Sequence, residues 1–338
     1  MAVRSEELVT GAPATQRWTR VRRVAVPIAR VVFTLAIVAA VIYATVSQWS
    51  DVQSYLSSLS WSSVALSGLM VMVATVTATM GWRAALRNFG DHVHVRTAGQ
   101  IYLVGILAKY LPGSVWAFVL QMELGRRANL PRIRPFLASL TLTGYGAVSG
   151  LLFGLFAIPA VSQVSGALVV VVIILAPIAL ICAQPAVLSW LLRRATTLVR
   201  RPAEFPTLTY RGMAPVAGWA IATTVTLGLH LWLLSGLSAT GGEGYMRSVG
   251  AIGLGMTLGM VAFLAPSGLG VREALIVAAL APYMSSGAAL GLALTSRLLL
   301  TLGDVLAAVV AGSTALPAIR LALSRGRTVS AAQPSSAE

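Results

Sequence analysis

The chain has 338 residues, of which 57% are hydrophobic and 10% are charged, and its mean hydropathy is +0.82. Soluble domains contain about 25% charged residues, so this composition excludes an ordinary soluble protein. The net charge of +15 would suggest a nucleic-acid partner in a soluble protein, but the arginines cluster between apolar runs, so we expect no such partner.

The N-terminal residues 1–23 form a basic tail that precedes an apolar run from Val24 to Val46. This run is too long for the core of a signal peptide, so we expect an uncleaved first span with a cytoplasmic N-terminus. We expect residues 24–320 to form a single transmembrane domain. Residues 321–338, rich in Ala and Ser, are expected to be a disordered cytoplasmic tail.

Eight apolar segments follow one another along the chain, each long enough to enter a hydrocarbon core of roughly 30 Å. They cover residues 26–47, 61–82, 97–120, 135–158, 165–191, 213–236, 249–283 and 287–315. The intervening stretches 48–60 and 159–164 are expected to be loops outside the cell.

The arginines decide how these segments are threaded, because cytoplasmic loops carry an excess of positive charge. If segment 97–120 crossed fully, nine arginines between residues 126 and 211 would lie outside. If segments 97–120 and 249–283 instead turn back within the membrane, only Arg247 is misplaced. We therefore predict an all-α polytopic protein of the eight-helix class, with about six full spans and two re-entrant helical hairpins. Units 61–158 and 213–315 then have opposite orientation, as in the inverted repeats of many transporters.

Both predicted re-entrant segments are interrupted by a Pro-Gly motif with charged residues beside it. A half-helix that restarts after such a break presents free N–H groups and a positive dipole end, which suit an anion. Lysine and arginine side chains next to the breaks add formal positive charge. The candidate residues for binding a lipid head group are Lys109, Pro112, Gly113, Ser114, Trp116, Ser267, Gly268, Gly270 and Arg272.

Three further ionisable residues, Glu273, Arg297 and Asp304, lie within apolar segments and form a candidate charge network. Arg297 and Asp304 share a helix face but are about 10 Å apart along the axis, too far for direct pairing. We expect Arg272 to pair with Asp304, and Glu273 to pair with Arg297 or Lys109. The network either fixes helix packing or takes part in gating.

Three stretches resemble the lysylphosphatidylglycerol synthase transmembrane-region family. They are Gly81–Arg87 (GWRAALR), Lys109–Trp116 (KYLPGSVW) and Phe263–Glu273 (FLAPSGLGVRE), of which the last is the most specific. The resemblance implies a flippase-like membrane domain, here without the synthase domain that transfers the amino acid. The family's commoner first motif continues after Pro-Gly with a small residue and Glu, whereas this chain has Trp116 and Ala117 in that region.

These observations together predict a multi-pass protein of the bacterial inner (cell) membrane with both termini in the cytoplasm. We expect it to bind an anionic phospholipid or a polyprenyl-phosphate-linked lipid at the two breaks and to move it between leaflets. It is not expected to be an enzyme or to need a cofactor or metal. The alternatives are an accessory subunit or an enzyme of a lipid-linked glycan or aminoacyl-lipid pathway. Candidate partners are a glycosyltransferase, a lipid synthase and a second copy of the chain.

Overall fold

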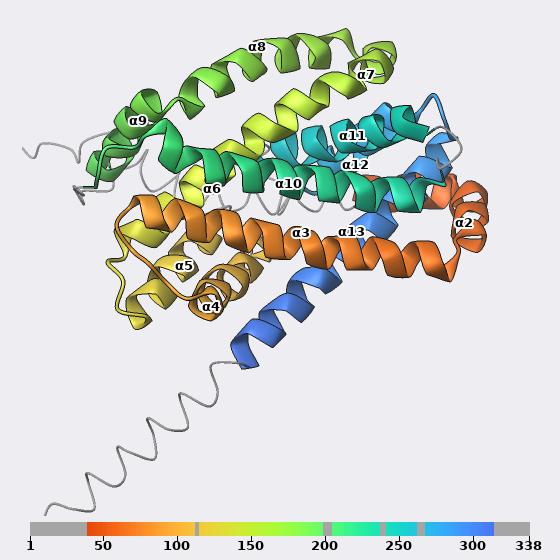
Figure 1. Cartoon of the computed structure of the whole chain (residues 1–338). Helices are drawn as coiled ribbons and strands as arrows, with labels where there is room; N and C mark the ends of the chain where they lie inside the picture. Colours follow the sequence, from red (N-terminus) through yellow and green to blue (C-terminus); the bar gives the residue numbers. More distant parts are fainter. Residues whose placement is uncertain (1–38, 112–114, 199–204, 237–240, 262–267, 314–338) are drawn as a thin grey trace, which may run out of the picture.

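The computed structural model describes residues 39–111, 115–198, 205–236, 241–261 and 268–313, and every regular element within these ranges is helical. Residues 39–47 are helical and are followed by twelve α-helices, labelled in Figure 1, and by two short 3₁₀ helices among the described residues. These are α2 (Trp49–Ser58), α3 (Trp61–Asn88), α4 (Val95–Ile106), η1 (Leu107–Tyr110), α5 (Trp116–Arg127), α6 (Ile133–Gly154), η2 (Leu155–Ala157), α7 (Ile158–Val164), α8 (Gly166–Ala183), α9 (Pro185–Leu198), α10 (Tyr210–Ser235), α11 (Gly241–Val261), α12 (Val271–Leu280) and α13 (Ser286–Ser313).

The prediction of a helical polytopic membrane protein is confirmed. Among the described residues, five helical stretches are long and apolar enough to cross a membrane: Trp61–Asn88, Ile133–Gln163, Gly166–Ala183, Tyr210–Ser235 and Ser286–Ser313. Most of the expected first span, residues 26–47, lies outside the described residues. Large apolar side chains of α8 such as Val170, Ile173 and Ile181 are exposed, as expected for a surface that contacts lipid.

Three sequence-based boundaries were wrong. The expected loop at 48–60 contains α2, whose Tyr55 donates a hydrogen bond of 3.0 Å to the Leu234 carbonyl oxygen on α10. The expected loop at 159–164 lies within α7. The segment 165–191 is not one span, because Gln184 is extended and Pro185 begins the separate helix α9. A residue before proline is disfavoured in the helical conformation, which accounts for the break at Gln184.

Two helical hairpins interrupt the long helices. The first hairpin consists of α4, η1 and α5, and the second consists of α11 and α12; the two helices of each hairpin pack against one another. Figure 1 shows the first hairpin at the end of the bundle where α3 ends, and the second toward the end that carries α2. The helices α4 and α5 have 12 residues each, and α12 has 10. All three are shorter than the roughly 20 residues that a full crossing requires.

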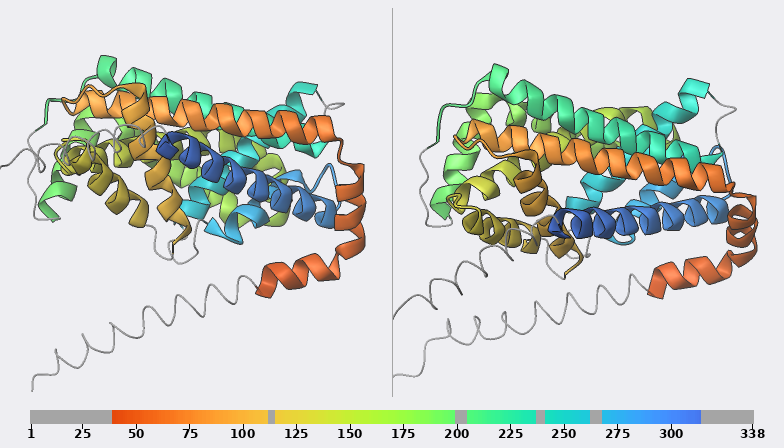
Figure 2. Two further views of the ribbon diagram at one scale, coloured as in Figure 1. Left: turned by 90° about the horizontal axis from the view of Figure 1, so that it is seen from below. Right: turned by 60° about the horizontal axis from the view of Figure 1, so that its bottom comes forward.

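The contacts of helices α3 to α6 are matched by those of α10 to α13. The contacts α3–α4, α4–α5 and α5–α6 correspond to α10–α11, α11–α12 and α12–α13. Across the two sets, the contact of α4 with α13 corresponds to that of α11 with α6, and α3 packs directly on α10. Figure 2 shows α13 (blue) running beside α3 (orange) toward the first hairpin.

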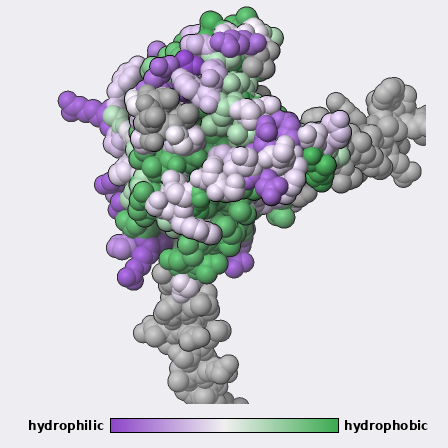
Figure 3. Space-filling model, turned by 90° about the vertical axis from the view of Figure 1, so that its right-hand side faces the viewer, coloured by the Kyte–Doolittle hydropathy of each residue, from purple (hydrophilic) through white to green (hydrophobic). Residues whose placement is uncertain are grey.

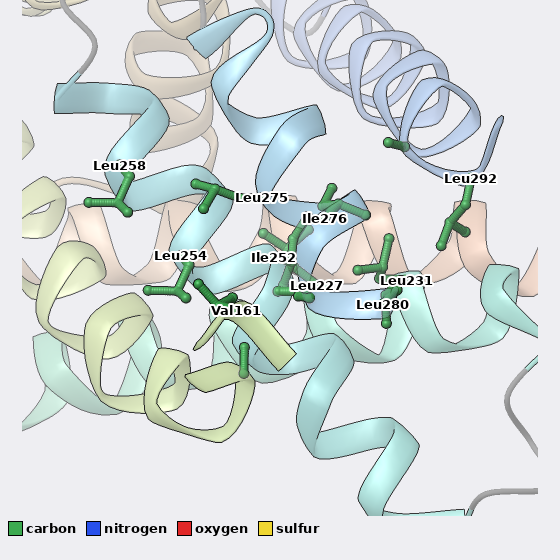
Figure 4. Packing of buried hydrophobic residues seen from close by; sticks show 14 of the residues in the cluster. Val161, Leu227, Leu231, Ile252, Leu254, Leu258, Leu275, Ile276, Leu280 and Leu292 are labelled. Carbon is green, nitrogen blue, oxygen red and sulfur yellow. The ribbon is translucent and has the colours of Figure 1, made fainter. Parts of the chain in front are cut away.

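The buried apolar residues form two clusters, one on each hairpin. The cluster around the second hairpin joins leucine and isoleucine side chains of α10, α11, α12 and α13, among them Leu231, Ile252, Ile276 and Leu292 (Figure 4). The other cluster surrounds Trp82, whose Nε1 donates a hydrogen bond of 2.8 Å to the Ser139 hydroxyl. Figure 3 shows the end of the molecule near α2, where hydrophilic and hydrophobic residues are mixed.

Candidate functional site

The two hairpins meet at a cavity in the middle of the bundle. It has a volume of about 340 Å³ and is lined from the first hairpin by Lys109 and Tyr110 and from the second by Gly268 and Arg272. That volume lies within the range of roughly 300–1,000 Å³ typical of ligand pockets. A second cavity of about 200 Å³ between α6, α10 and α11 shares several lining residues with it, including Tyr102 and Met256. The second cavity is lined mainly by apolar residues and glycines, so the combined space has a charged end and an apolar end.

Lys109 and Asp304 form an ion pair at the charged end. The Lys109 Nζ lies 2.6 Å from the Asp304 Oδ2, and the Tyr110 hydroxyl donates a hydrogen bond of 2.6 Å to the same oxygen. The side chains of Lys109 and Asp304 are 30% and 13% exposed. Asp304 therefore pairs with Lys109. The pairing of Asp304 with Arg272 that the sequence predicted is wrong.

Arg272 lines the cavity with a guanidinium group that is largely unpaired. The residue is 6% exposed, and its Nε and Nη2 atoms have no hydrogen-bond partner among the residues that the structure describes. Its remaining nitrogen, Nη1, lies 3.8 Å from the Met256 sulfur, a weak acceptor. A buried charge without a partner is costly and marks a site where a ligand of opposite charge would be stabilised.

The room for Arg272 comes from glycines on the facing helix. A Cβ atom on Gly255 would lie 2.9 Å from the Arg272 Cγ. Gly268 has a φ of +66°, and a Cβ there would lie 2.9 Å from the Gly259 Cα. The glycines of the second motif thus serve backbone conformation and close helix packing, in addition to any approach of a ligand.

Glu273 and Arg297 hold the start of α12 in place. Arg297 Nη1 donates a hydrogen bond of 2.6 Å to Glu273 Oε1, which is one of the expected pairings. The other carboxylate oxygen, Oε2, accepts a hydrogen bond of 2.7 Å from the backbone N–H of Gly270. Glu273 caps α12, and this N–H of Gly270 is therefore used within the protein and not directed at a ligand.

The remaining predicted residues are placed as follows. Pro112, Gly113, Ser114 and Ser267 lie outside the described residues. Trp116 begins α5 and is 47% exposed; the cavity is lined there by the next two residues instead. The structure thus brings together Lys109, Gly268, Arg272, Arg297 and Asp304 around one cavity. Glu273 does not line the cavity but forms an ion pair with Arg297.

Sequence reasoning missed the uncharged polar side chains of the cavity. Tyr102, Thr143, Thr223 and Thr301 line it together with Tyr110. Tyr102 and Lys109 are seven residues apart in the first hairpin, or about two helical turns, a spacing that places them on one face and could have identified Tyr102. The threonines on long apolar helices carry no such signal, because isolated threonines are common in membrane helices.

Comparison with known proteins decides the family. The family model described as "Lysylphosphatidylglycerol synthase TM region" matches residues 29–329, most of the chain. The chain belongs to this family. A comparison with curated proteins found no match. In this member of the lysylphosphatidylglycerol synthase TM region family, the matched region contains both hairpins and every residue of the cavity.

Proposed function

We propose that this protein binds the anionic head group of a phospholipid or a polyprenyl-phosphate-linked lipid in the cavity and moves that lipid between the leaflets. The observation that carries the proposal is the Arg272 guanidinium, which is buried, faces the cavity and has two nitrogens without a partner in the described parts of the chain. A phosphate oxygen accepts charge-assisted hydrogen bonds from such a fork of N–H groups.

The shape of the cavity supports a lipid as the ligand. Arg272 lies at the charged end, and the adjoining cavity is lined by apolar side chains such as Leu142, Ile252 and Met260. A molecule with a phosphate at one end and acyl or prenyl chains at the other fits this polarity. Membership of a lipid-related membrane family supports the same ligand class.

Movement between leaflets is supported by the arrangement of the hairpins. The first hairpin is built from two short helices, and the second pairs the 21-residue α11 with the short α12. The two approach from opposite ends of the bundle and contribute to one cavity. We propose that they are re-entrant and that α3–α6 and α10–α13 form an inverted repeat, with the matched contacts of the two sets as support. Alternate opening of the two hairpins would expose the head-group site first to one side and then to the other.

Purified protein in liposomes tests the proposal. Fluorescently labelled phosphatidylglycerol is placed in both leaflets, and dithionite bleaches only the label on the outer face. Wild-type protein is expected to make the protected half of the label accessible, and Arg272→Met is expected to slow this at least tenfold. Arg87→Met removes an exposed arginine outside the cavity and should translocate like wild type. Equal rates for the wild type and Arg272→Met, with both correctly inserted, would refute the site.

The alternatives make different predictions in the same preparation. An accessory subunit would show no translocation without its partner protein. An enzyme of a lipid-linked glycan or aminoacyl-lipid pathway would convert the lipid chemically, which mass spectrometry of the extracted lipids detects.

A further inference from the structure

The charges around the cavity leave a single positive charge uncompensated. Lys109, Arg272 and Arg297 supply three cations, and Asp304 and Glu273 supply two carboxylates. Lys109 pairs with Asp304, and Arg297 pairs with Glu273, so the described residues leave only Arg272 without a carboxylate. A ligand carrying one negative charge would neutralise the site; a second negative charge would itself be buried without compensation.

The two carboxylates are already occupied by groups of the protein. Asp304 Oδ2 accepts hydrogen bonds from Lys109 and Tyr110, and the two oxygens of Glu273 accept from Arg297 and from the Gly270 N–H. An ammonium group on the ligand would have to displace one of these cations to obtain a counter-charge. The cavity therefore disfavours a cationic or zwitterionic head group.

The uncharged polar groups of the cavity are hydroxyls. The side chains of Tyr102 and Thr143, which each carry one hydroxyl, line it. Thr223 and Thr301 add two more hydroxyls, which use their protons on backbone carbonyls and keep acceptor capacity. Such groups pair with hydroxyls of a ligand, because each hydroxyl both donates and accepts.

We propose that the head group recognised here is a phosphodiester with one negative charge whose remaining part is uncharged and hydroxylated, such as a glycerol or sugar phosphodiester. This inference rests on the proposed head-group site at Arg272. It assigns the phosphate to Arg272 and the hydroxyl groups to Tyr102 and Thr143, which line both cavities and so lie where the charged end meets the apolar end. Asp304 and Glu273 determine specificity indirectly, because they neutralise Lys109 and Arg297.

Lipid binding to the purified full-length protein at pH 8 tests the charge count. Phosphatidylglycerol and phosphatidylinositol carry one phosphodiester charge and hydroxyls. Phosphatidic acid with a phosphomonoester approaches two charges at this pH. Phosphatidylethanolamine adds an ammonium group. With identical acyl chains, the first two are expected to bind at least tenfold more tightly than the last two. Equal or tighter binding of phosphatidic acid or phosphatidylethanolamine would overturn the inference.

Asp304→Asn provides the complementary test. This change frees Lys109 and adds one positive charge to the cavity while keeping an acceptor for Tyr110. The preference for phosphatidylglycerol over phosphatidic acid should then shrink at least tenfold. Asp51→Asn changes an exposed acid on α2 that does not line the cavity; it is the matched control and should keep the wild-type preference. An unchanged preference in Asp304→Asn would overturn the charge count.

The hydroxyl part has its own probe. Phosphatidylmethanol carries the same single phosphodiester charge without any hydroxyl on its head group, and is expected to bind about tenfold more weakly than phosphatidylglycerol. Tyr102→Phe should reduce this difference, whereas Tyr210→Phe, an exposed residue, should not. Equal binding of the two lipids by wild type would overturn the assignment of a hydroxylated head group.

Two further outcomes separate the inference from the function on which it rests. If lipid binding does not depend on Arg272, as tested with Arg272→Met, the proposed function fails as well. If binding depends on Arg272 but shows no preference among the lipids, only the inference about the head group fails.

A soluble phosphodiester separates a lipid ligand from a free one. Glycerophosphoglycerol should compete for the site at least tenfold more weakly than phosphatidylglycerol. Equal competition would show that the ligand is a free phosphodiester and not a lipid.

Discussion

Lys109 and Asp304 join the tip of the first hairpin to α13 through an ion pair of 2.6 Å. The pair also neutralises one of the cations at the cavity, so any ligand that uses Lys109 must first separate it from Asp304. The carboxylate keeps the Tyr110 hydroxyl when Lys109 is removed, but loses its counter-charge.

Lys109→Ala is expected to lower the free energy of unfolding by about 1–3 kcal/mol, because it leaves a mostly buried carboxylate without a cation. The double variant Lys109→Ala/Asp304→Ala should lower the free energy of unfolding by less than the sum of the two single variants' losses. Thermal unfolding in detergent measures this double-mutant cycle. The Arg247–Glu243 pair, with 67% of the Glu243 side chain exposed, is the control and should show coupling of about 0–1 kcal/mol. Additive effects for Lys109 and Asp304 would contradict an energetic role for the pair.

Arg272→Met is expected to stabilise the protein while it abolishes lipid binding. The change removes a buried charge whose Nε and Nη2 atoms have no partner within the described ranges, and keeps most of the side-chain volume. Relief of unpaired buried groups is worth about 1–3 kcal/mol. Thermal unfolding without added lipid provides the measurement. A charge that only held the helices together would give the opposite result, a loss of stability on removal.

Arg297→Met is the matched comparison for that experiment. It breaks the pair with Glu273 and leaves this buried carboxylate with the Gly270 N–H as its one remaining partner among the described residues. We therefore expect destabilisation by about 2–4 kcal/mol, opposite in sign to the effect at Arg272. Two neighbouring arginines of one cavity would thus differ in the sign of their contribution to stability, which separates the ligand-binding group from the structural one.

The sequence was sufficient for the helical membrane class, because apolar run length reports on it directly. Pro112, Gly113 and Pro266 of the two predicted breaks lie outside the described residues. It placed Glu273 with Arg297 but wrongly paired Arg272 with Asp304. Which of several charges meet depends on how hairpins far apart in the sequence pack, and no local pattern encodes this. The short helix α2 was missed since its polar composition resembles that of a loop.

The crossing of α6 and α11 depends on a pair of glycines. A Cβ atom on Gly150 would lie 2.6 Å from the Gly253 carbonyl oxygen, a distance that the packed backbones do not allow. Gly150→Ala is expected to destabilise the protein by about 1–3 kcal/mol through overpacking. Gly144→Ala on the same helix meets nothing within 4 Å and should be neutral or stabilising by about 0.5–1 kcal/mol. Thermal unfolding of the two variants decides this; equal stability would contradict close packing at this crossing.

Cysteine labelling in a Cys182→Ser background tests the re-entrant hairpins. Single cysteines at Arg127, Arg194 and Pro282, all exposed, are treated in intact cells with an impermeant thiol reagent. If α4 and α5 form a re-entrant hairpin, positions 127 and 194 lie on the cytoplasmic side and stay unlabelled, whereas position 282 is labelled. Labelling of all three after permeabilisation is the control for reactivity.

A full crossing by the first hairpin segment gives the reverse pattern at two of these positions. Cysteines 127 and 194 would then be labelled in intact cells, and the arginines around them would face outward against the positive-inside rule. In that case α3–α6 and α10–α13 could not have opposite orientations, and the alternate opening of two hairpins around Arg272 would have to be abandoned. Protection at 127 and 194 with labelling at 282 would instead place the hairpins on opposite sides of the membrane, with the unpaired guanidinium between them.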